Sequence, residues 1–312
     1  MQHVVCFSGG HSSALVAVEV VRRYGPGAVT LLNHRINPRV EDPDVQRFKE
    51  DVARALGLPI TYANHARWEE WDQFDVVEHA RAFKVGSGTE LCTARLKTEP
   101  FDAWLATYAP PGSAVLYYGF DANEGHRIQR RASILAAKGY ETAFPLAHWP
   151  RTIRSTRELG IEPPLTYGVW KHANCTGCLK AGKQHWFVVY ATRRDVWERA
   201  KLAEERIGYT IHDGVSLEEL EADFAAMQAA GVVPTEQVPP GAFWSDAKKR
   251  VRLRVIEETQ LTLAFSKPCE CVTRVRKPRW ARGTVVACTC GAPTGEGHAL
   301  ACARVMGAGV AA

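Results

Sequence analysis

A strand–loop–helix unit at the N-terminus constrains the fold of this chain more than any other feature. The apolar segment His3–Phe7 predicts a short strand, and the residues from about Ser12 to Tyr24 predict an apolar-rich helix. The loop between them reads Ser8-Gly9-Gly10-His11-Ser12-Ser13. Strand, loop and helix in this order are the opening unit of an α/β protein.

The same order repeats through the first half of the chain. Further strands are predicted at Ala28–Leu32, Pro59–Tyr62 and Ala114–Gly119, and further helices at Pro43–Leu56 and after the fourth strand through about Lys138. Strands that alternate with helices form parallel sheets covered on both faces. We therefore expect an α/β fold whose ligand binds outside the carboxyl ends of the strands.

Three regions are predicted along the chain. Residues 1–168 form the α/β domain, residues 169–238 carry a Cys-x-x-Cys motif and two charged helices, and residues 239–312 form a small, basic, cysteine-rich tail. The helices are expected at about Asp195–Ile207 and Ser216–Ala230. No apolar run approaches the ~20 residues that cross a bilayer, and the N-terminus does not read as a signal peptide. We therefore expect a cytoplasmic protein with no membrane partner.

The loop after the first strand has the residues of an anion site. Gly9 and Gly10 allow the backbone to approach a ligand closely, and the N–H groups of the following helix attract negative charge. Ser8, Ser12 and Ser13 add hydroxyl donors. The loop lacks the Gly-Lys-Ser/Thr ending of a Walker A loop. The alternative is a plain glycine-rich turn with a serine helix cap.

The pattern Ser8-Gly-Gly-x-x-Ser13 resembles the PP-loop of the ATP pyrophosphatases, the adenine nucleotide α-hydrolase superfamily. His11 stands where many members have Asp. The resemblance implies the PP-loop form of the sheet, cleavage of ATP at its α-phosphate, and Mg²⁺ with the nucleotide. It places the cofactor against the loop and the end of the second strand: Ser8, Gly9, Gly10, His11, Ser12, Ser13 and Asn33.

Later motifs resemble the phosphoadenylylsulfate (PAPS) and adenylylsulfate reductase family over about residues 3–190. In order they are Cys92-Thr-Ala-Arg-Leu-Lys97-x-x-Pro100, Gly119-x-x-x-x-Glu124-x-x-Arg127, Pro164-Leu165-x-Tyr167 and Cys175-Thr-Gly-Cys178. The resemblance implies that Lys97, Glu124 and Arg127 are catalytic. Spacing alone makes Glu124 and Arg127 an i,i+3 surface pair.

Three cysteines match cluster positions of that family. Its adenylylsulfate reductases hold a [4Fe–4S] cluster with a Cys-Cys pair and a Cys-x-x-Cys about eighty residues later. Cys175 follows Cys92 by 83 positions, and thiolates are the usual cluster ligands. Leu91 replaces one Cys, so Cys92, Cys175 and Cys178 leave one iron open, as in PP-loop enzymes that insert sulfur into tRNA. A zinc site at Cys175 and Cys178, or no metal, are the alternatives.

The tail carries its own charge and cysteine pattern. Lys248–Arg282 contains eleven Lys or Arg and three Glu, a local charge of +8, whereas the rest of the chain sums to −3. A basic segment of this kind indicates a nucleic-acid or phosphate partner. Four thiolates in two pairs suit Zn²⁺; they are Cys269, Cys271, Cys288 and Cys290. The alternative is a solvated basic face with incidental cysteines.

These patterns predict a PAPS reductase-like PP-loop enzyme that binds ATP, adenylates an acceptor with release of pyrophosphate, and transfers sulfur with an iron–sulfur cluster. The acceptor is expected to be nucleic acid, the sulfur donor or redox partner is open, and a homodimer is allowed. One alternative is a sulfonucleotide reductase, although the Glu-Cys-Gly-Leu-His motif of those enzymes is missing. The other is a non-catalytic nucleotide- or nucleic-acid-binding protein.

Overall fold

A computed structural model describes residues 1–83, 90–173 and 175–265, with side chains up to residue 256. The chain divides into two compact units, Met1–Arg250 and Val251–Ala312. The predicted zinc ligands Cys269, Cys271, Cys288 and Cys290 lie outside the described residues. Within the described part, no helix has both the length and the apolar character needed to cross a membrane.

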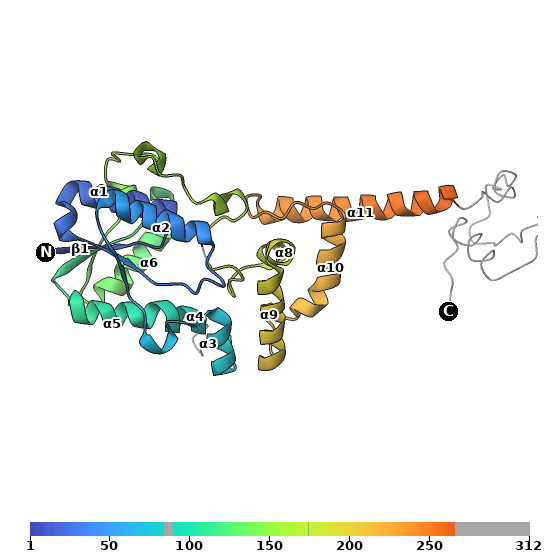
Figure 1. The fold of residues 1–312 in the computed structure, drawn as a ribbon, viewed down its shortest axis with the longest axis horizontal. Helices are drawn as coiled ribbons and strands as arrows, with labels where there is room; N and C mark the ends of the chain where they lie inside the picture. Colours follow the sequence, from blue (N-terminus) through green and yellow to red (C-terminus); the bar gives the residue numbers. More distant parts are fainter. Residues whose placement is uncertain (84–89, 174, 266–312) are drawn as a thin grey trace, which may run out of the picture. The chain divides into compact units, whose positions relative to one another are not determined.

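A five-stranded parallel sheet forms the centre of the first unit (Figure 1), in the order β3-β2-β1-β4-β5. The strands are β1 (Gln2–Cys6), β2 (Val29–Asn33), β3 (Ile60–Tyr62), β4 (Ala114–Tyr117) and β5 (Glu141–Ala143). The predicted α/β fold with a parallel sheet is confirmed. Strand β5 was not predicted, because its three residues contain no apolar run or alternation that marks a strand.

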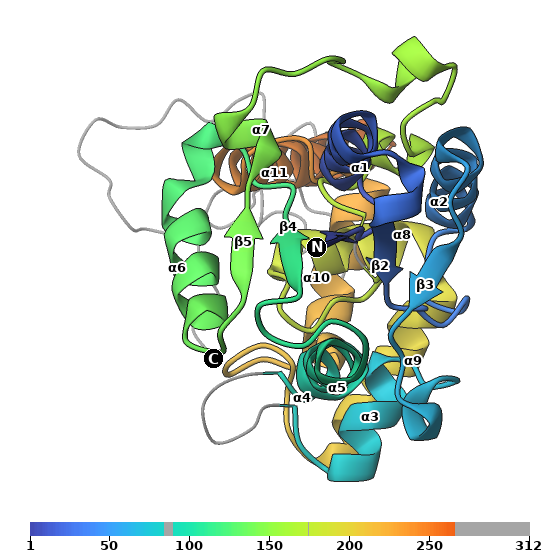
Figure 2. The same ribbon diagram turned by 90° about the vertical axis from the view of Figure 1, so that its left-hand side faces the viewer.

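Helices cover both faces of this sheet, as the alternation of strands and helices predicted (Figure 2). Val5 faces a core with α1 and α2, while its neighbour Val4 faces a second core with α5 and α6. Successive strand residues point to opposite faces, so both must be apolar. The helices of these layers are α1 (His11–Tyr24), α2 (Pro43–Leu56), α5 (Glu99–Tyr108), α6 (Gly125–Ala136) and α7 (Pro145–His148).

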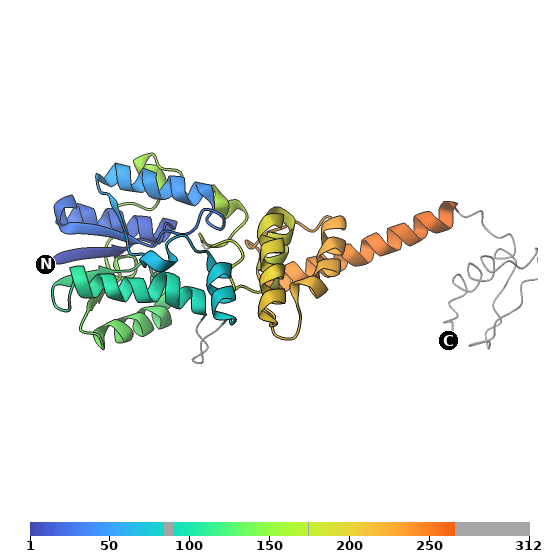
Figure 3. The same ribbon diagram turned by 60° about the horizontal axis from the view of Figure 1, so that its bottom comes forward.

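A helical segment lies on the side where the strands end (Figures 1 and 3). Trp186, Trp197 and Phe224 form its core, with ring centroids 5.5–6.3 Å apart along the pairs. Arg199 joins this segment to the sheet domain through ion pairs with Asp75 and Glu78. The helices of this segment are α8 (Lys183–Thr192), α9 (Arg194–Ile207), α10 (Leu217–Ala229) and the first part of α11 (Pro240–Phe265), whereas Asp75 and Glu78 lie on α3 (Gln73–Ala80).

Candidate functional site

The predicted anion loop connects β1 to α1, next to the point where the order of strand addition reverses. From β1 the chain adds β2 and β3 on one side and then β4 on the other, which makes the gap between β1 and β4 a topological switch point. Ligands of open α/β sheets bind at such points. In the described structure Gly10 is the N-cap residue of α1 and provides no side-chain cap, so the first N–H groups of the helix face the loop.

The serines of the loop differ in their surroundings. Ser13 is buried, and its hydroxyl donates to the carbonyl of Gly10 at 2.8 Å. The Ser8 hydroxyl donates to Ser13 Oγ at 3.2 Å, while Ser8 and Ser12 are exposed. Ser13 therefore shapes the turn, and the hydroxyls of Ser8 and Ser12 are available to a ligand.

Two glycines are required where backbone segments meet at this loop. Gly9 has a φ of +82°, and a Cβ there would lie 2.8 Å from Cδ of Lys49. Gly119, just after β4, would place a Cβ 3.0 Å from the backbone nitrogen of Ser13. A side chain at Gly9 would require Lys49 to shift, and one at Gly119 would press on the backbone at the start of α1, so both positions favour glycine.

The segment after β5 returns to the loop and covers the start of α1. The backbone N–H of His11 donates to the Tyr167 hydroxyl at 3.0 Å, and its ring Nε2 accepts from the Thr156 N–H at 3.3 Å. Burial lowers the pKa of His11, and the nearby Arg157 lowers it further. Both the backbone and the ring of His11 are therefore engaged in the structure, and the Tyr167 oxygen lies at the first N–H group of α1.

A buried ion pair lies beneath Gly9. Lys49 is 2% exposed, and its Nζ lies 2.7 Å from Oε1 of the buried Glu41. Burial raises the pKa of Glu41, and the charges of Lys49 and then of Lys97 oppose this rise. A cavity of about 560 Å³ opens beside the pair, between α2 and the ends of β2 and β3, and is also lined by Arg35 and Tyr62.

The structure brings the three predicted cluster cysteines and Lys97 together. Burial, followed by the neighbouring thiols of Cys175 and Cys178, raises the pKa of Cys92 to about 11. The pKa of Lys97 is raised, first by the negative charge that Cys175 can carry and then, against burial, by Cys178 and Cys92. Residues 83 positions apart in the sequence thus interact around one half-buried lysine.

A π-helical turn positions Lys97 relative to Cys92. The helix α4 (Leu91–Thr93) passes into the π-helical η3 (Ala94–Thr98) and then into α5. Pro100 explains the wide turn, because its ring lacks an N–H and would clash with the carbonyl four residues earlier in an α-helix. Bonds from i to i+5 place residues five apart on neighbouring turns, which puts Lys97 one turn beyond Cys92.

The Cys175-Thr-Gly-Cys178 turn is held from three sides. The N–H of Thr176 donates to the carbonyl of Val40 at 2.8 Å, and Nε2 of the buried Gln73 donates to the carbonyl of Thr176 at 2.7 Å. Gly177 has a φ of +73°, and a Cβ there would lie 2.7 Å from Val196. The glycine between the two cysteines is therefore fixed by packing against α9.

His185 and Glu236 support the same turn. The N–H of Cys178 donates to Nε2 of His185 at 3.2 Å, so the other ring nitrogen carries the proton and donates to Glu236 at 2.7 Å. Burial raises the pKa of Glu236, but the hydrogen bonds from His185 and from the Lys171 N–H lower it overall. This carboxylate and imidazole fix the position of one thiol.

Two residues at the end of β2 form hydrogen bonds that connect neighbouring strand ends. The Asn33 amide donates to the carbonyl of Phe7 at 2.5 Å and is buried. Its neighbour His34 donates through Nδ1 to the carbonyl of Ala63 at 2.6 Å. Burial lowers the pKa of His34 to about 4, and Lys97 contributes to this lowering. The amide of Asn33 thus holds two strand ends together beside the loop.

Glu124 and Arg127 form the i,i+3 pair that their spacing predicted. Glu124 also accepts the Asp121 N–H at 2.9 Å, which closes a capping box before α6. Arg127 is exposed, and its guanidinium lies 4.4 Å from the centroid of the Phe120 ring. Their catalytic role remains a prediction.

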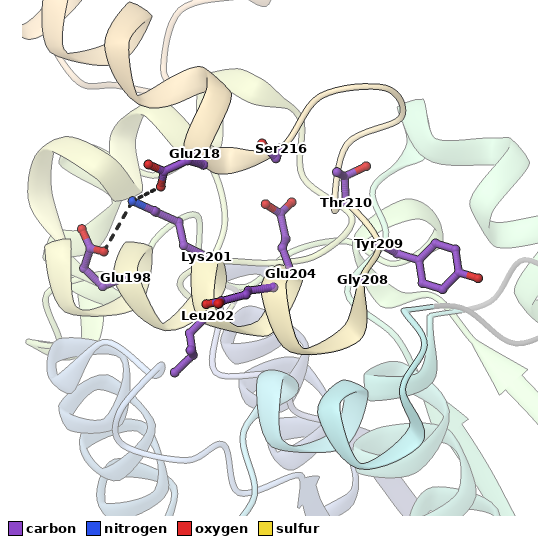
Figure 4. A pocket seen from close by; sticks show the side chains of 10 residues that line it. Glu198, Lys201, Leu202, Glu204, Gly208, Tyr209, Thr210, Ser216 and Glu218 are labelled. Carbon is purple, nitrogen blue, oxygen red and sulfur yellow. Dashed lines mark ion pairs between the residues drawn. The ribbon is translucent and has the colours of Figure 1, made fainter.

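A separate cavity of about 600 Å³ lies between α9 and α10 (Figure 4). Lys201 pairs with Glu198 and Glu218 at its edge. Glu204 accepts the backbone N–H groups of Ile211 and Leu217, each at 2.7 Å. These charges stabilise the connection between the two helices, and the residues that line this cavity are not those of the candidate site.

The side chains of Cys92, Cys175 and Cys178 are thiols, and thiolates are the usual ligands of an iron–sulfur cluster. Among the described side chains, no group of three or more His, Cys, Asp or Glu is arranged to hold a metal ion. Each thiolate of a cluster binds a different iron, so cluster ligands lie farther apart than the ligands of a single ion. Cys92, Cys175 and Cys178 are free thiols that meet beside a cation.

No family model, curated protein or solved structure matches the chain.

The site also includes residues that the sequence patterns did not single out: Lys49, Glu41, Gln73, His185 and Glu236. A lysine on the apolar side of the helix Pro43–Leu56 was the available signal for the first of these, since lysine is rarely fully buried without a partner.

Proposed function

We propose that this chain is a PP-loop enzyme that uses ATP to adenylate an acceptor and then transfers sulfur to it. The observation that carries the proposal is a continuous series of interactions from the loop to the thiols. Gly9 lies against Lys49, Lys49 pairs with Glu41, and Lys97 interacts with Glu41 and with all three cysteines. This series supports the proposal that an anion loop and a sulfur-bearing group share one site.

The loop would bind the triphosphate at the start of α1. The N–H groups of the first helical turn and the hydroxyls of Ser8 and Ser12 are the donors, and the helix dipole favours the negative charge. Tyr167 now accepts from the first of these N–H groups. A phosphate oxygen would replace the Tyr167 oxygen there, and the phenol could then donate to the phosphate.

The chemistry has two steps that balance without an oxidant or reductant. An oxygen of the acceptor attacks the α-phosphorus of ATP, the bond to the bridging oxygen breaks, and pyrophosphate leaves with the electron pair. A sulfide then attacks the activated carbon, the C–O bond breaks, and AMP leaves. Lys97 would stabilise negative charge on the phosphate or the sulfur.

Cys92, Cys175 and Cys178 would hold a [4Fe–4S] cluster. When bound, the cluster supplies an iron with an exchangeable coordination position, because Leu91 leaves only three protein thiolates. The chain's own part is to orient these thiolates, through Gln73, His185 and the π-helical turn. The raised pKa values of Cys92 and Cys178 mean that binding must displace their protons.

Calorimetric titration of the full chain with Mg²⁺-ATP tests the loop. Gly10→Val places a branched side chain where a Cβ already meets the Tyr167 oxygen at 3.1 Å, so we expect ATP binding to be lost. Gly27→Val is the control, since a Cβ at Gly27 meets nothing within 4 Å. Absence of ATP binding by the unmodified protein, or unchanged affinity in Gly10→Val, would overturn the proposal.

A further inference from the structure

Three aromatic rings form a platform at the ends of β4 and β5. Tyr118, Phe120 and Phe144 have ring centroids 5.9, 6.0 and 6.2 Å apart, with interplanar angles of only 14–29°. Three nearly equal mutual distances exclude a stacked column, in which one distance would be twice the others. The rings therefore form a triangular cluster with roughly parallel planes. Phe144 is buried, whereas Tyr118 and Phe120 are half-buried.

Arginines from α6 cover this platform. The Arg127 guanidinium lies 4.4 Å from the Phe120 centroid, and that of Arg131 lies 5.3 Å from the Tyr118 centroid. Arg130 follows Arg127 by one helical turn and is exposed. Among the described residues Arg130 forms no ion pair. Helix α6 carries these three arginines and no acidic residue. We call the three rings with these three arginines the aromatic–arginine surface.

This surface begins at the candidate nucleotide site. Gly119 lies between Tyr118 and Phe120, and a Cβ at this position would meet the backbone of Ser12 and Ser13 at the start of α1. The Tyr118 side chain also forms a hydrogen bond with the side chain of Cys6, the last residue of β1. A planar group resting on Tyr118 and Phe120 would therefore lie beside the switch point between β1 and β4.

We propose that the aromatic–arginine surface binds single-stranded nucleic acid and places one base over Tyr118 and Phe120, in exchange for the guanidinium groups of Arg131 and Arg127 that lie there now. Aromatic faces and arginine planes stack on any base, while arginine charges neutralise the phosphates, and both elements are present here. A duplex hides its base faces, so the surface suits a single strand. Its role in presenting the acceptor rests on the proposed function, but binding itself does not.

Two variants of the full chain test this proposal by fluorescence anisotropy with labelled 12-nucleotide RNA and DNA strands. Arg130→Gln removes one phosphate contact, which should weaken binding about fivefold at 0.1 M salt and lower the salt slope by about 0.7. Phe120→Leu keeps the apolar volume but removes the stacking face, and should weaken binding by about fivefold or more.

Matched controls are Arg54→Gln and Tyr108→Leu, which change an exposed arginine on α2 and an exposed tyrosine on α5. The basic tail is the same in all variants, so differences between them report the surface. Calorimetric ATP binding distinguishes the two proposals. Unchanged oligonucleotide affinity and salt slope in both Arg130→Gln and Phe120→Leu would overturn the inference. So would a loss of ATP binding in Phe120→Leu with strand binding unchanged, since the rings would then serve the nucleotide.

Discussion

The Lys49 ammonium lies 2.7 Å from the Glu41 carboxylate inside the protein, and the Lys49 stem fills the space in front of Gly9. One side chain thus shapes the loop after β1 and neutralises a buried acid that also interacts with Lys97. The stem of Lys49 thus contacts the loop, and its partner Glu41 acts electrostatically on Lys97 together with the three thiols.

We expect Lys49→Met to destabilise the protein by about 3–5 kcal/mol, because it leaves Glu41 buried without its closest cation. Urea denaturation of the variant measures this loss. The double variant Lys49→Met, Glu41→Gln removes both charges and should recover part of it. Equal stability of Lys49→Met and the unmodified protein would show that the pair is solvated.

Gly119→Ala should weaken ATP binding by about tenfold or more. Its Cβ would lie 3.0 Å from the Ser13 nitrogen and 3.1 Å from the Ser12 carbonyl carbon. These are backbone atoms that cannot move aside without moving the start of α1, and a lost hydrogen bond to a charged group costs about 1.5–3 kcal/mol. Calorimetry measures the change. Gly125→Ala is the control, since its Cβ meets nothing within 4 Å; a similar effect in both would refute the close-contact explanation.

Anaerobically purified protein should contain about four iron atoms per chain, as one [4Fe–4S] cluster requires. Cys92→Ala, Cys175→Ala and Cys178→Ala should each lose most of this iron in an elemental assay. Cys6→Ala is a matched control, because Cys6 is a half-buried free thiol like the other three, and its pKa, which burial raises to about 11, is influenced by Tyr118 and Arg131. Iron that survives in the three variants, or zinc alone in the unmodified protein, would contradict the cluster.

The tail should hold its metal separately. Cys269→Ala and Cys288→Ala are expected to lose zinc and keep iron, because their thiols belong to a different predicted site. Metal analysis of the same samples checks this. Loss of iron in these tail variants would assign the cluster to the tail instead.

His34 should make the protein sensitive to acid. Its pKa is lowered to about 4 in the fold, against about 6.5 in an unfolded chain. The neutral imidazole therefore stabilises the fold fully above pH 6.5, and this contribution is lost as the pH falls toward 4, by at most about 3 kcal/mol. His34→Gln should lose less stability than the unmodified protein between pH 6.5 and 4.5 in urea titrations. Parallel curves would show that His34 titrates normally.

The residue at which the chain is truncated should determine the stability of the remaining protein. Phe243 in α11 is buried, with its ring centroid 5.8 Å from that of Phe187. A chain that ends at Arg250 keeps this contact and should melt like the full protein. A chain that ends at Pro239 loses it, and removal of a buried Phe costs about 3–5 kcal/mol. Equal melting temperatures for the two truncations would refute the packing argument.

Much of the fold follows from patterns that are local in the sequence. The apolar runs of β1, β2 and β4 and the helical spacing in α2 predicted those elements within one or two residues, because each pattern reports the burial of its own element. Strand β5 has no such pattern. Its three residues form a strand only because β4 offers an edge to pair with.

Some features of the candidate site were likewise predictable from the sequence, and others were not. The sequence by itself determined the loop Ser8–Ser13 and the order of Cys92, Cys175 and Cys178, since glycines and cysteines are informative wherever they stand. Only the tertiary structure decided that Lys49 is buried against Glu41 and that Lys97 lies among the thiols. It likewise brought the rings of Tyr118, Phe120 and Phe144 together. Those relationships join residues from different strands and helices, so they depend on distances that no local pattern encodes.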